Sequence, residues 1–189
     1  MRKQLDMADY IQRVCDPLDI KTVLAIGVGN KGPVAQYYWE NVRKIDRGYL
    51  CDIWTIKPAP SVWIPLKMDA LKLLEVLKPK CVDIVQACGF LEHLTLKDAI
   101  KFLFDVAEVL ARKVVFLSCA TTCHSHEGIT GVDPLYKTKL DKNPYHEYKS
   151  IWSHQQLEAW GYKTNIKDIL NGRFVLNGEI EAWKILVDK

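Results

Sequence analysis

The chain has 189 residues, of which 49% are hydrophobic and 26% are charged, and its formal net charge is +3. This length and composition are those of a single globular domain with a full hydrophobic core, and they exclude disordered, collagen-like and small disulfide-rich proteins. The charge is too weakly basic for a dedicated nucleic-acid binder, and no apolar run is long enough to span a membrane.

Strand and helix patterns alternate along the first two thirds of the chain. Short apolar runs predict strands, and helical spacing or helix-end signals predict helices. In chain order we expect a helix over 6–14, a strand over 22–26, a helix over 33–44, strands over 49–53 and 63–67, a helix over 71–77, a strand over 82–87, a helix over 96–110 and a strand over 113–118. This alternation is typical of a parallel sheet with helices on both faces, a Rossmann-like three-layer α/β sandwich.

The alternation stops in the last third of the chain. Residues 119–152 hold turn formers, histidines and tyrosines without a clear period, which predicts a substrate loop or lid. A helix capped by Ser153 and ended by Gly161 should follow. The strands expected over 162–169 and 180–187 have no helix between them, so they should pair antiparallel as a hairpin. We therefore expect one domain over 1–189, with a mostly parallel sheet that ends in an antiparallel hairpin.

The connection between the first strand and the next helix is rich in glycine. Gly27, Gly29 and Gly32 form a G-x-G-x-x-G pattern, and Pro33 suits the first turn of a helix. The first glycine allows a tight turn, the second lets a ligand approach the backbone, and the third lets the helix pack closely on the strand. The alternative is a glycine-rich turn that binds no ligand, because the spacing alone is a weak signal.

Four motifs, in order, resemble those of the class I S-adenosylmethionine-dependent methyltransferases. They are residues 23–29, residues 51–53 at the end of the second strand, residues 67–70 after the third, and residues 83–87 followed by Glu92-His93-Leu94 after the fourth. Small stand-alone methyltransferase domains often carry such a Glu-His-Leu. The expected hairpin also agrees with this family, whereas a nicotinamide-binding domain would continue as another parallel crossover.

The resemblance implies that S-adenosylmethionine binds at the carboxyl ends of the first four strands. Gly27 and Gly29 would supply bare backbone, and Asp52, 20 residues beyond Gly32, would accept from the ribose hydroxyls. Asp69 would accept from the adenine amine, although it is equally suited to cap the next helix, and Asp52 could instead be a solvated strand end. The expected cofactor-binding residues are Gly27, Val28, Gly29, Asn30, Gly32, Asp52, Ile53, Met68, Asp69, Ala70, Gln86 and Ala87.

Ala25 departs from the pattern of this family. The first motif commonly has an acidic residue there, which steadies the glycine turn or the ammonium group of the cofactor. Alanine can do neither, so Asn30 or the pair Gln86-Ala87 would have to compensate. Without compensation, the chain would bind the cofactor weakly or would be a non-catalytic binding domain.

His93 is the expected catalytic residue. It follows the fourth strand, at the edge where open α/β folds bind ligands, and histidine titrates near neutral pH, so it can take a proton from a hydroxyl or amine acceptor. Alternatively, Glu92 and His93 cap or orient the helix over 96–110. Residues expected to contact the substrate are His124, Tyr145, His146, Tyr148 and Trp152, and the alternative is that they form a packed connector over the sheet edge.

These residues favour methyl transfer to a small-molecule acceptor, and the sequence does not indicate the oligomeric state. An RNA- or protein-directed methyltransferase, an NAD-binding oxidoreductase and a non-catalytic domain are the alternatives. Cys119, Cys123, His124 and His126 are residue types that bind zinc, but no second pair completes a site, so we expect no metal. The first nine residues lack a signal-peptide core, so we expect a cytoplasmic protein whose six cysteines are free thiols.

Overall fold

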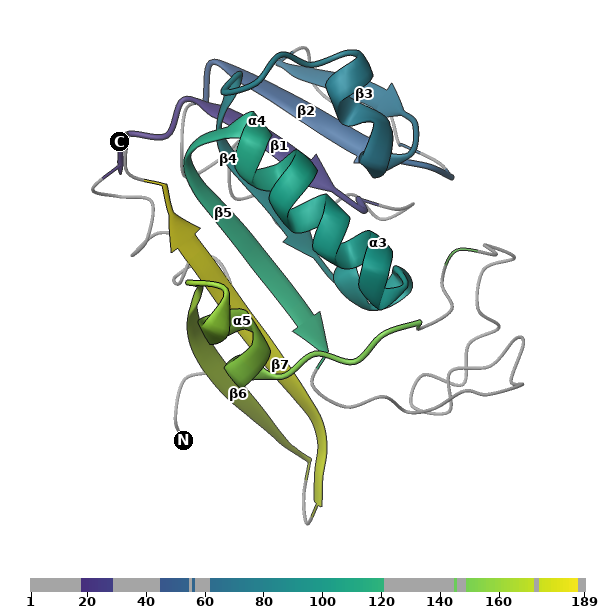
Figure 1. The fold of residues 1–189 in the computed structure, drawn as a ribbon, viewed down its shortest axis with the longest axis vertical. Helices are drawn as coiled ribbons and strands as arrows, with labels where there is room; N and C mark the ends of the chain where they lie inside the picture. The colour runs from purple at the N-terminus through teal and green to yellow at the C-terminus, as the bar shows by residue number, and fades with distance from the viewer. Residues whose placement is uncertain are drawn as a thin grey trace.

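The sheet is the centre of the structure, a computed structural model that describes residues 18–28, 45–54, 56, 62–120, 145, 149–171 and 174–186. It has seven strands in the order β3-β2-β1-β4-β5-β7-β6 (Figure 1). They are β1 (Thr22–Ile26), β2 (Arg47–Asp52), β3 (Trp63–Lys67), β4 (Val82–Cys88), β5 (Ala111–Ala120), β6 (Lys163–Asn171) and β7 (Phe174–Ile185). Strands β1 to β5 pair in parallel, and β7 is antiparallel to β5 and β6. The predicted sheet with its terminal antiparallel hairpin is confirmed.

The hairpin strands are longer than the sequence predicts. Asn-Gly pairs at 171–172 and 177–178 suggested a wide gap between two short strands. Instead β7 begins at Phe174, so Asn177 and Gly178 lie within the ladder, where they pair with Ile169 and Asp168. The register shifts between Ile169 and Leu170. A bulge of this kind places an extra residue in one strand without ending the pairing, which is why the second turn signal does not end the strand.

One continuous helix follows β4, made of α3 (Leu96–Lys101), the π-helical turn η4 (Phe102–Ala107) and α4 (Glu108–Leu110). Thr95 caps it, because its hydroxyl accepts the N–H of Asp98 at 3.2 Å. The prediction of a helix over 96–110 is confirmed, although its middle turn is π rather than α. The buried residues recur at helical spacing and are Ala99, Phe102, Leu103, Val106, Ala107 and Leu110.

The remaining described helices are short. The helix predicted over 71–77 is a 3₁₀ helix instead, η2 (Ala70–Glu75), which suits a segment of so few turns. A second 3₁₀ turn, η3 (Leu91–His93), lies between β4 and α3. Helix α5 (His154–Ala159) begins with a capping box between Ser153 and Gln156, and Gly161 follows it at φ +84°, as predicted for both ends.

Helices η2, α3, α4 and α5 cover one face of the sheet (Figure 1). Their apolar side chains pack on residues such as Leu24, Val85 and Leu117 to form the larger core cluster. The other face carries a second cluster that includes Val23, Ile84 and Phe116. Helices predicted over 6–14 and 33–44 lie outside the described residues. None of the described helices is long and apolar enough to cross a membrane.

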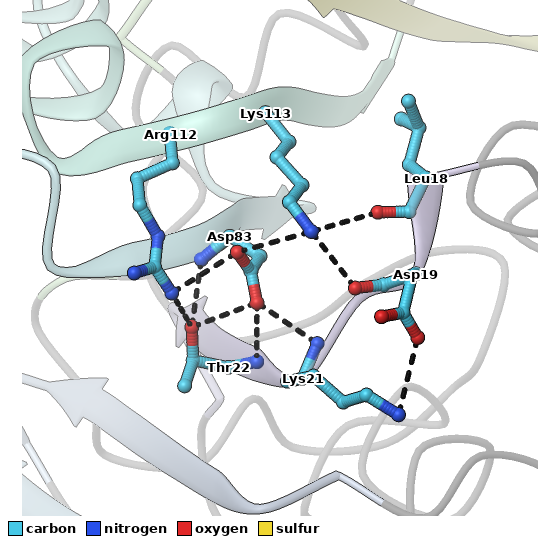
Figure 2. Close-up of polar contacts among 7 residues, drawn as sticks. All are labelled: Leu18, Asp19, Lys21, Thr22, Asp83, Arg112 and Lys113. Atoms are coloured by element: carbon cyan, nitrogen blue, oxygen red, sulfur yellow. Dashed lines mark hydrogen bonds and ion pairs between the residues drawn. The ribbon is translucent and has the colours of Figure 1, made fainter.

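Asp83 fastens the amino ends of three parallel strands (Figure 2). Its Oδ2 accepts the N–H groups of Lys21 and Thr22, each at 2.9 Å, and its Oδ1 lies 3.0 Å from Arg112 Nη2 and 3.5 Å from Lys113 Nζ. Burial by itself raises the pKa of Asp83, but the two backbone donors and the two cations together lower it by more. The pKa of Asp83 therefore lies below its ordinary value. These groups come from β1, β4, β5 and the residue before β1. Asp83 therefore helps to fix the register of the three strands, and with it the relative positions of their carboxyl ends.

Candidate functional site

The turn after β1 exposes bare backbone at the carboxyl edge of the sheet. Gly27 has φ +69°, a conformation that favours glycine, and its N–H donates to the carbonyl of Cys51 at 2.9 Å. A Cβ on Gly27 would stand 3.0 Å from Phe90 Cδ2, so the position leaves little room for a side chain. Val28 is 7% exposed. The tight turn predicted at Gly27 is therefore present, while Gly29, Asn30 and Gly32 lie outside the described residues.

A carboxylate stands at the end of the neighbouring strand. Asp52 is the last residue of β2, and its Oδ1 accepts the backbone N–H of Trp54 at 2.7 Å. Its carbonyl accepts the N–H of Met68 at 3.1 Å, which holds the end of β2 against the end of β3. Ile53 and Trp54 are 39% and 41% exposed. Asp52 is thus placed at the carboxyl edge, followed by two apolar side chains with free surface.

The end of β3 brings a second carboxylate to the same place. Asp69 caps η2, because its Oδ1 accepts the N–H of Leu71 at 2.9 Å. Ala70 behind it is 5% exposed. Burial, followed by the charges of Asp52 and Asp69, raises the pKa of the Cys51 thiol to about 12. The Cys51 thiol itself donates to the carbonyl of Met68 at 3.5 Å, and the helix-capping role considered for Asp69 is confirmed.

The end of β4 is buried more deeply than the ends of β2 and β3. Gln86 is 2% exposed and Ala87 has no exposed surface. The amide nitrogen of Gln86 donates to the sulfur of Cys88 at 3.4 Å. Gln86 also stands beside Ala25 in the parallel register of β4 and β1, on the face of the second core cluster. An amide therefore lies next to the position where the sequence lacks an acid.

His93 ends the 3₁₀ turn that follows β4. It is half-buried, and its N–H donates to the carbonyl of Phe90 at 3.1 Å. Neither Glu92 nor His93 caps the next helix, since Thr95 does so. The carbonyl of Glu92 instead accepts the N–H groups of Lys149 and Ser150, at 2.7 and 3.2 Å. This turn therefore anchors the chain that returns towards α5.

The predicted substrate residues have different environments. Trp152 is 1% exposed, its Nε1 donates to the hydroxyl of Ser150 at 2.9 Å, and its ring meets Trp160 edge-on. It packs in the core, as the alternative of a packed connector anticipated. Tyr145 is 41% exposed, and its ring centroid lies 6.2 Å from that of Trp54. His124, His146 and Tyr148 lie outside the described residues.

Comparison with solved structures finds proteins of similar fold, although no family model and no curated protein matches the sequence. A putative S-adenosylmethionine-dependent methyltransferase from Listeria monocytogenes has a TM-score of 0.60 at 12% identity, over 95% of this chain and 97% of that one. An S-adenosylmethionine-dependent methyltransferase from Archaeoglobus fulgidus has a TM-score of 0.54 at 16% identity, over 94% of this chain and 92% of that one. A putative methyltransferase from Streptococcus mutans, in complex with S-adenosylhomocysteine, has a TM-score of 0.50 at 7% identity, over 95% and 94%.

The chain has the fold of the class I S-adenosylmethionine-dependent methyltransferases. Similar folds also include a small RNA methyltransferase and a carbon methyltransferase, so the methyltransferase fold by itself does not specify an acceptor.

Two features of this methyltransferase fold were missed from the sequence. Trp54 lies beside Asp52 with 41% of its surface exposed, and a large aromatic directly after a strand-end acid was the available signal. Asp83 was treated only as part of a motif, although an acid opening an otherwise apolar strand indicates a buried, paired carboxylate. Among the described residues, Cys51, Cys81, Cys88 and Cys119 are free thiols, and no group of three potential metal ligands occurs. Cys123, His124 and His126 lie outside the described part.

Proposed function

We propose that this chain is an enzyme that uses S-adenosylmethionine to methylate a small molecule. The observation that carries the proposal is the convergence of Gly27, Asp52 and Asp69 at adjacent strand ends within this sheet order. In open α/β sheets, ligands bind outside the carboxyl ends of the strands, where the strand order reverses. Here the order reverses between β1 and β4, directly beside the Gly27 turn. The antiparallel β7 argues against a nicotinamide-binding domain.

The residues present fit the parts of the cofactor. Bare backbone at Gly27 would accommodate the methionine portion, and the carboxylate of Asp52 would accept from the ribose hydroxyls. Asp69 caps η2 through one carboxylate oxygen, and its other oxygen would accept from the adenine amine. The small Ala70 would leave room for the adenine ring. The amide of Gln86, beside Ala25, is placed on the strand next to the turn and would receive the ammonium group.

The bound cofactor supplies a methyl group on a sulfonium, which is already a good leaving group. The remaining task of the protein is to align the acceptor atom with the methyl carbon and to exclude water, and alignment can contribute about 7–11 kcal/mol. A hydroxyl or amine acceptor then loses a proton, which we assign to His93 as general base.

A small-molecule acceptor is favoured over RNA because the net charge is only +3. Calorimetric titration tests the proposal, with S-adenosylhomocysteine, S-adenosylmethionine and NAD added separately to the purified chain. We expect the first two to bind and NAD not to bind. Asp52→Ala should abolish binding, whereas Asp105→Asn, an exposed aspartate on η4, should leave it unchanged.

Four results would overturn all or part of the proposal. Binding of NAD alone would favour an oxidoreductase, and binding of no ligand would remove the cofactor site. Binding of S-adenosylhomocysteine with no methyl transfer to any compound in a hydroxyl, amine and RNA panel would make the chain a non-catalytic binding domain. Methyl transfer to RNA alone would retain the cofactor assignment and replace the acceptor class.

A further inference from the structure

The chain that precedes η3 is in direct contact with the glycine turn after β1. A Cβ on Gly27 would stand 3.0 Å from Cδ2 of Phe90, the residue before η3, so the ring of Phe90 lies against the bare backbone of Gly27. The same ring meets that of Phe102 edge-on, with the two centroids 5.0 Å apart. Any shift of η3 would therefore move Phe90 relative to the Gly27 turn, where the methionine portion of the cofactor would bind.

The chain that leads to α5 holds η3 by hydrogen bonds to two of its carbonyls. The carbonyl of Glu92 accepts the N–H groups of Lys149 and Ser150, at 2.7 and 3.2 Å. The hydroxyl of Ser150 donates to the carbonyl of Leu91 at 3.0 Å. A short 3₁₀ turn has poor hydrogen-bond geometry within itself, so bonds from outside contribute much to fixing its position.

Ser150 also connects η3 to the core beneath α5. Its oxygen accepts from Nε1 of Trp152 at 2.9 Å while its proton is donated to Leu91, so the hydroxyl acts as donor and acceptor at once and its direction is fixed. Trp152 is 1% exposed, and its ring centroid lies 5.8 Å from that of Trp160. Because Trp152 is held in a close-packed core, it gives the hydroxyl, and through it η3, a rigid point of attachment.

The same stretch of chain contacts the other side of the Gly27 turn. Four residues before Lys149, the ring centroid of Tyr145 lies 6.2 Å from that of Trp54, whose N–H donates to Asp52 at the end of β2. In the sheet, β2 and β4 are the two neighbours of β1. Tyr145 and Lys149 thus contact the chain that follows each neighbour of the strand leading to Gly27. A ligand held by Gly27 and Asp52 would lie next to both contacts.

We propose, on the basis of the proposed function, that Ser150 is a positioning residue for the cofactor. It fixes η3, and η3 fixes Phe90 against Gly27, so that the bare backbone of the turn meets the ligand already in its bound arrangement. Preorganisation of this kind raises affinity, because less ordering remains to occur on binding. In this assignment Ser150 does not touch the cofactor and acts only through Leu91 and Phe90.

Calorimetric titration with S-adenosylhomocysteine, at a temperature where every variant is folded, separates this role from a purely structural one. Ser150→Ala removes the hydroxyl and should weaken binding about fivefold, a ratio typical of one lost hydrogen bond. Ser150→Thr keeps a hydroxyl and should bind within about twofold of the wild type. The matched control is Ser153→Ala, which removes the hydroxyl that accepts the N–H of Gln156 at 3.2 Å. It should destabilise the cap of α5 and leave the affinity within about twofold.

Amide hydrogen exchange of the wild type gives an independent test. A ligand whose affinity depends on the bonds between Ser150 and η3 must stabilise those bonds in return, because linkage is reciprocal. Saturation with S-adenosylhomocysteine should therefore slow the exchange of the Lys149 and Ser150 amides several-fold. The amide of Tyr162, which donates to Leu157 at 3.1 Å beyond the far end of α5, should be slowed less.

The role of Ser150 is overturned if Ser150→Ala binds as tightly as the wild type, or if Ser150→Thr or Ser153→Ala shares its loss in full. If circular dichroism shows that Ser150→Ala is unfolded, the exchange measurement decides, and unchanged exchange of the Lys149 and Ser150 amides overturns the role. Failure of S-adenosylhomocysteine to bind the wild type overturns the proposed function and this role with it. A wild type that binds, with Ser150→Ala unaffected, leaves the proposed function intact and removes only the role of Ser150.

Discussion

Asp83→Asn tests how strongly the amino edge of the sheet is fastened. Asparagine keeps the size of the side chain and one oxygen that can accept from Lys21 and Thr22, but it has no charge and would turn an N–H₂ group towards Arg112 and Lys113 in place of the second oxygen. Removing one partner of a buried ion pair costs about 3–5 kcal/mol. Arg112 and Lys113 are 46% and 36% exposed, so water partly compensates them, and we expect the free energy of unfolding to fall by about 3 kcal/mol.

The effect of Asp83→Asn should depend on pH with a defined sign. The folded chain holds the pKa of Asp83 below the ordinary value of 3.8, so its carboxylate contributes stability that is present in full above that value. This stability is lost as the pH falls through the folded pKa. Urea unfolding near pH 7 should show the whole difference between wild type and variant, and unfolding below about pH 4 should show a smaller one.

Asp105→Asn is the control for Asp83→Asn, because Asp105 is exposed on η4 and should change the free energy of unfolding by less than about 0.5 kcal/mol. A loss below about 1 kcal/mol for Asp83→Asn near neutral pH, or a difference that does not shrink in acid, would refute the reasoning.

Further variants test individual contacts. A Cβ on Gly48 would overlap the six-membered ring of Trp63, which is 4% exposed, so Gly48→Ala should lower the free energy of unfolding by about 3 kcal/mol. The control is Gly89→Ala, which should lower it by only about 1 kcal/mol, because Gly89 has φ +59° but its nearest contact would be at 4.0 Å. Equal losses for the two variants would contradict the clash with Trp63. His93→Ala should reduce methyl transfer about 10²–10⁴-fold at unchanged affinity for S-adenosylhomocysteine, and full turnover would make His93 structural. Burial and two carboxylates raise the pKa of the Cys51 thiol to about 12, so Cys51 should stay unmodified by iodoacetamide near pH 8 while half-buried Cys88 reacts. Mass spectrometry measures the labelling of each cysteine, and equal labelling of the two would contradict the raised pKa.

The fold could be predicted because its strands are short apolar runs between turn signals. Strands β1 and β3 have the predicted bounds, and the alternation of elements indicated a parallel sheet. The details of helix hydrogen bonding could not be predicted, since the buried stripe of the helix over 96–110 fits an α or a π turn equally well. The hairpin was underestimated because an Asn-Gly pair signals a turn but is also tolerated within a bulged ladder.

The candidate site could be predicted only in part, for a related reason. Gly27 directly follows β1, Asp52 ends β2 and Asp69 lies two residues after β3. Since the carboxyl ends of parallel strands meet at one edge, their convergence follows from the chain order. Trp152 lies in a stretch without periodicity, where the sequence does not tell a buried aromatic side chain from an exposed one. Its place in the core is set by contacts with Ser150 and Trp160 that depend on the tertiary fold.

The strand register explains why position 25 holds alanine where the family commonly has an acidic residue. In the sequence it is an isolated loss of an acidic side chain from the first strand. In the sheet it pairs with Leu50 on one side and Gln86 on the other, and all three are at most 2% exposed. A larger side chain at position 25 would compete for this space with the carboxamide of Gln86, whose nitrogen bonds to Cys88. The small residue on β1 and the polar residue on β4 are therefore complementary, and under the proposed function the group that receives the cofactor ammonium lies on β4 rather than on β1.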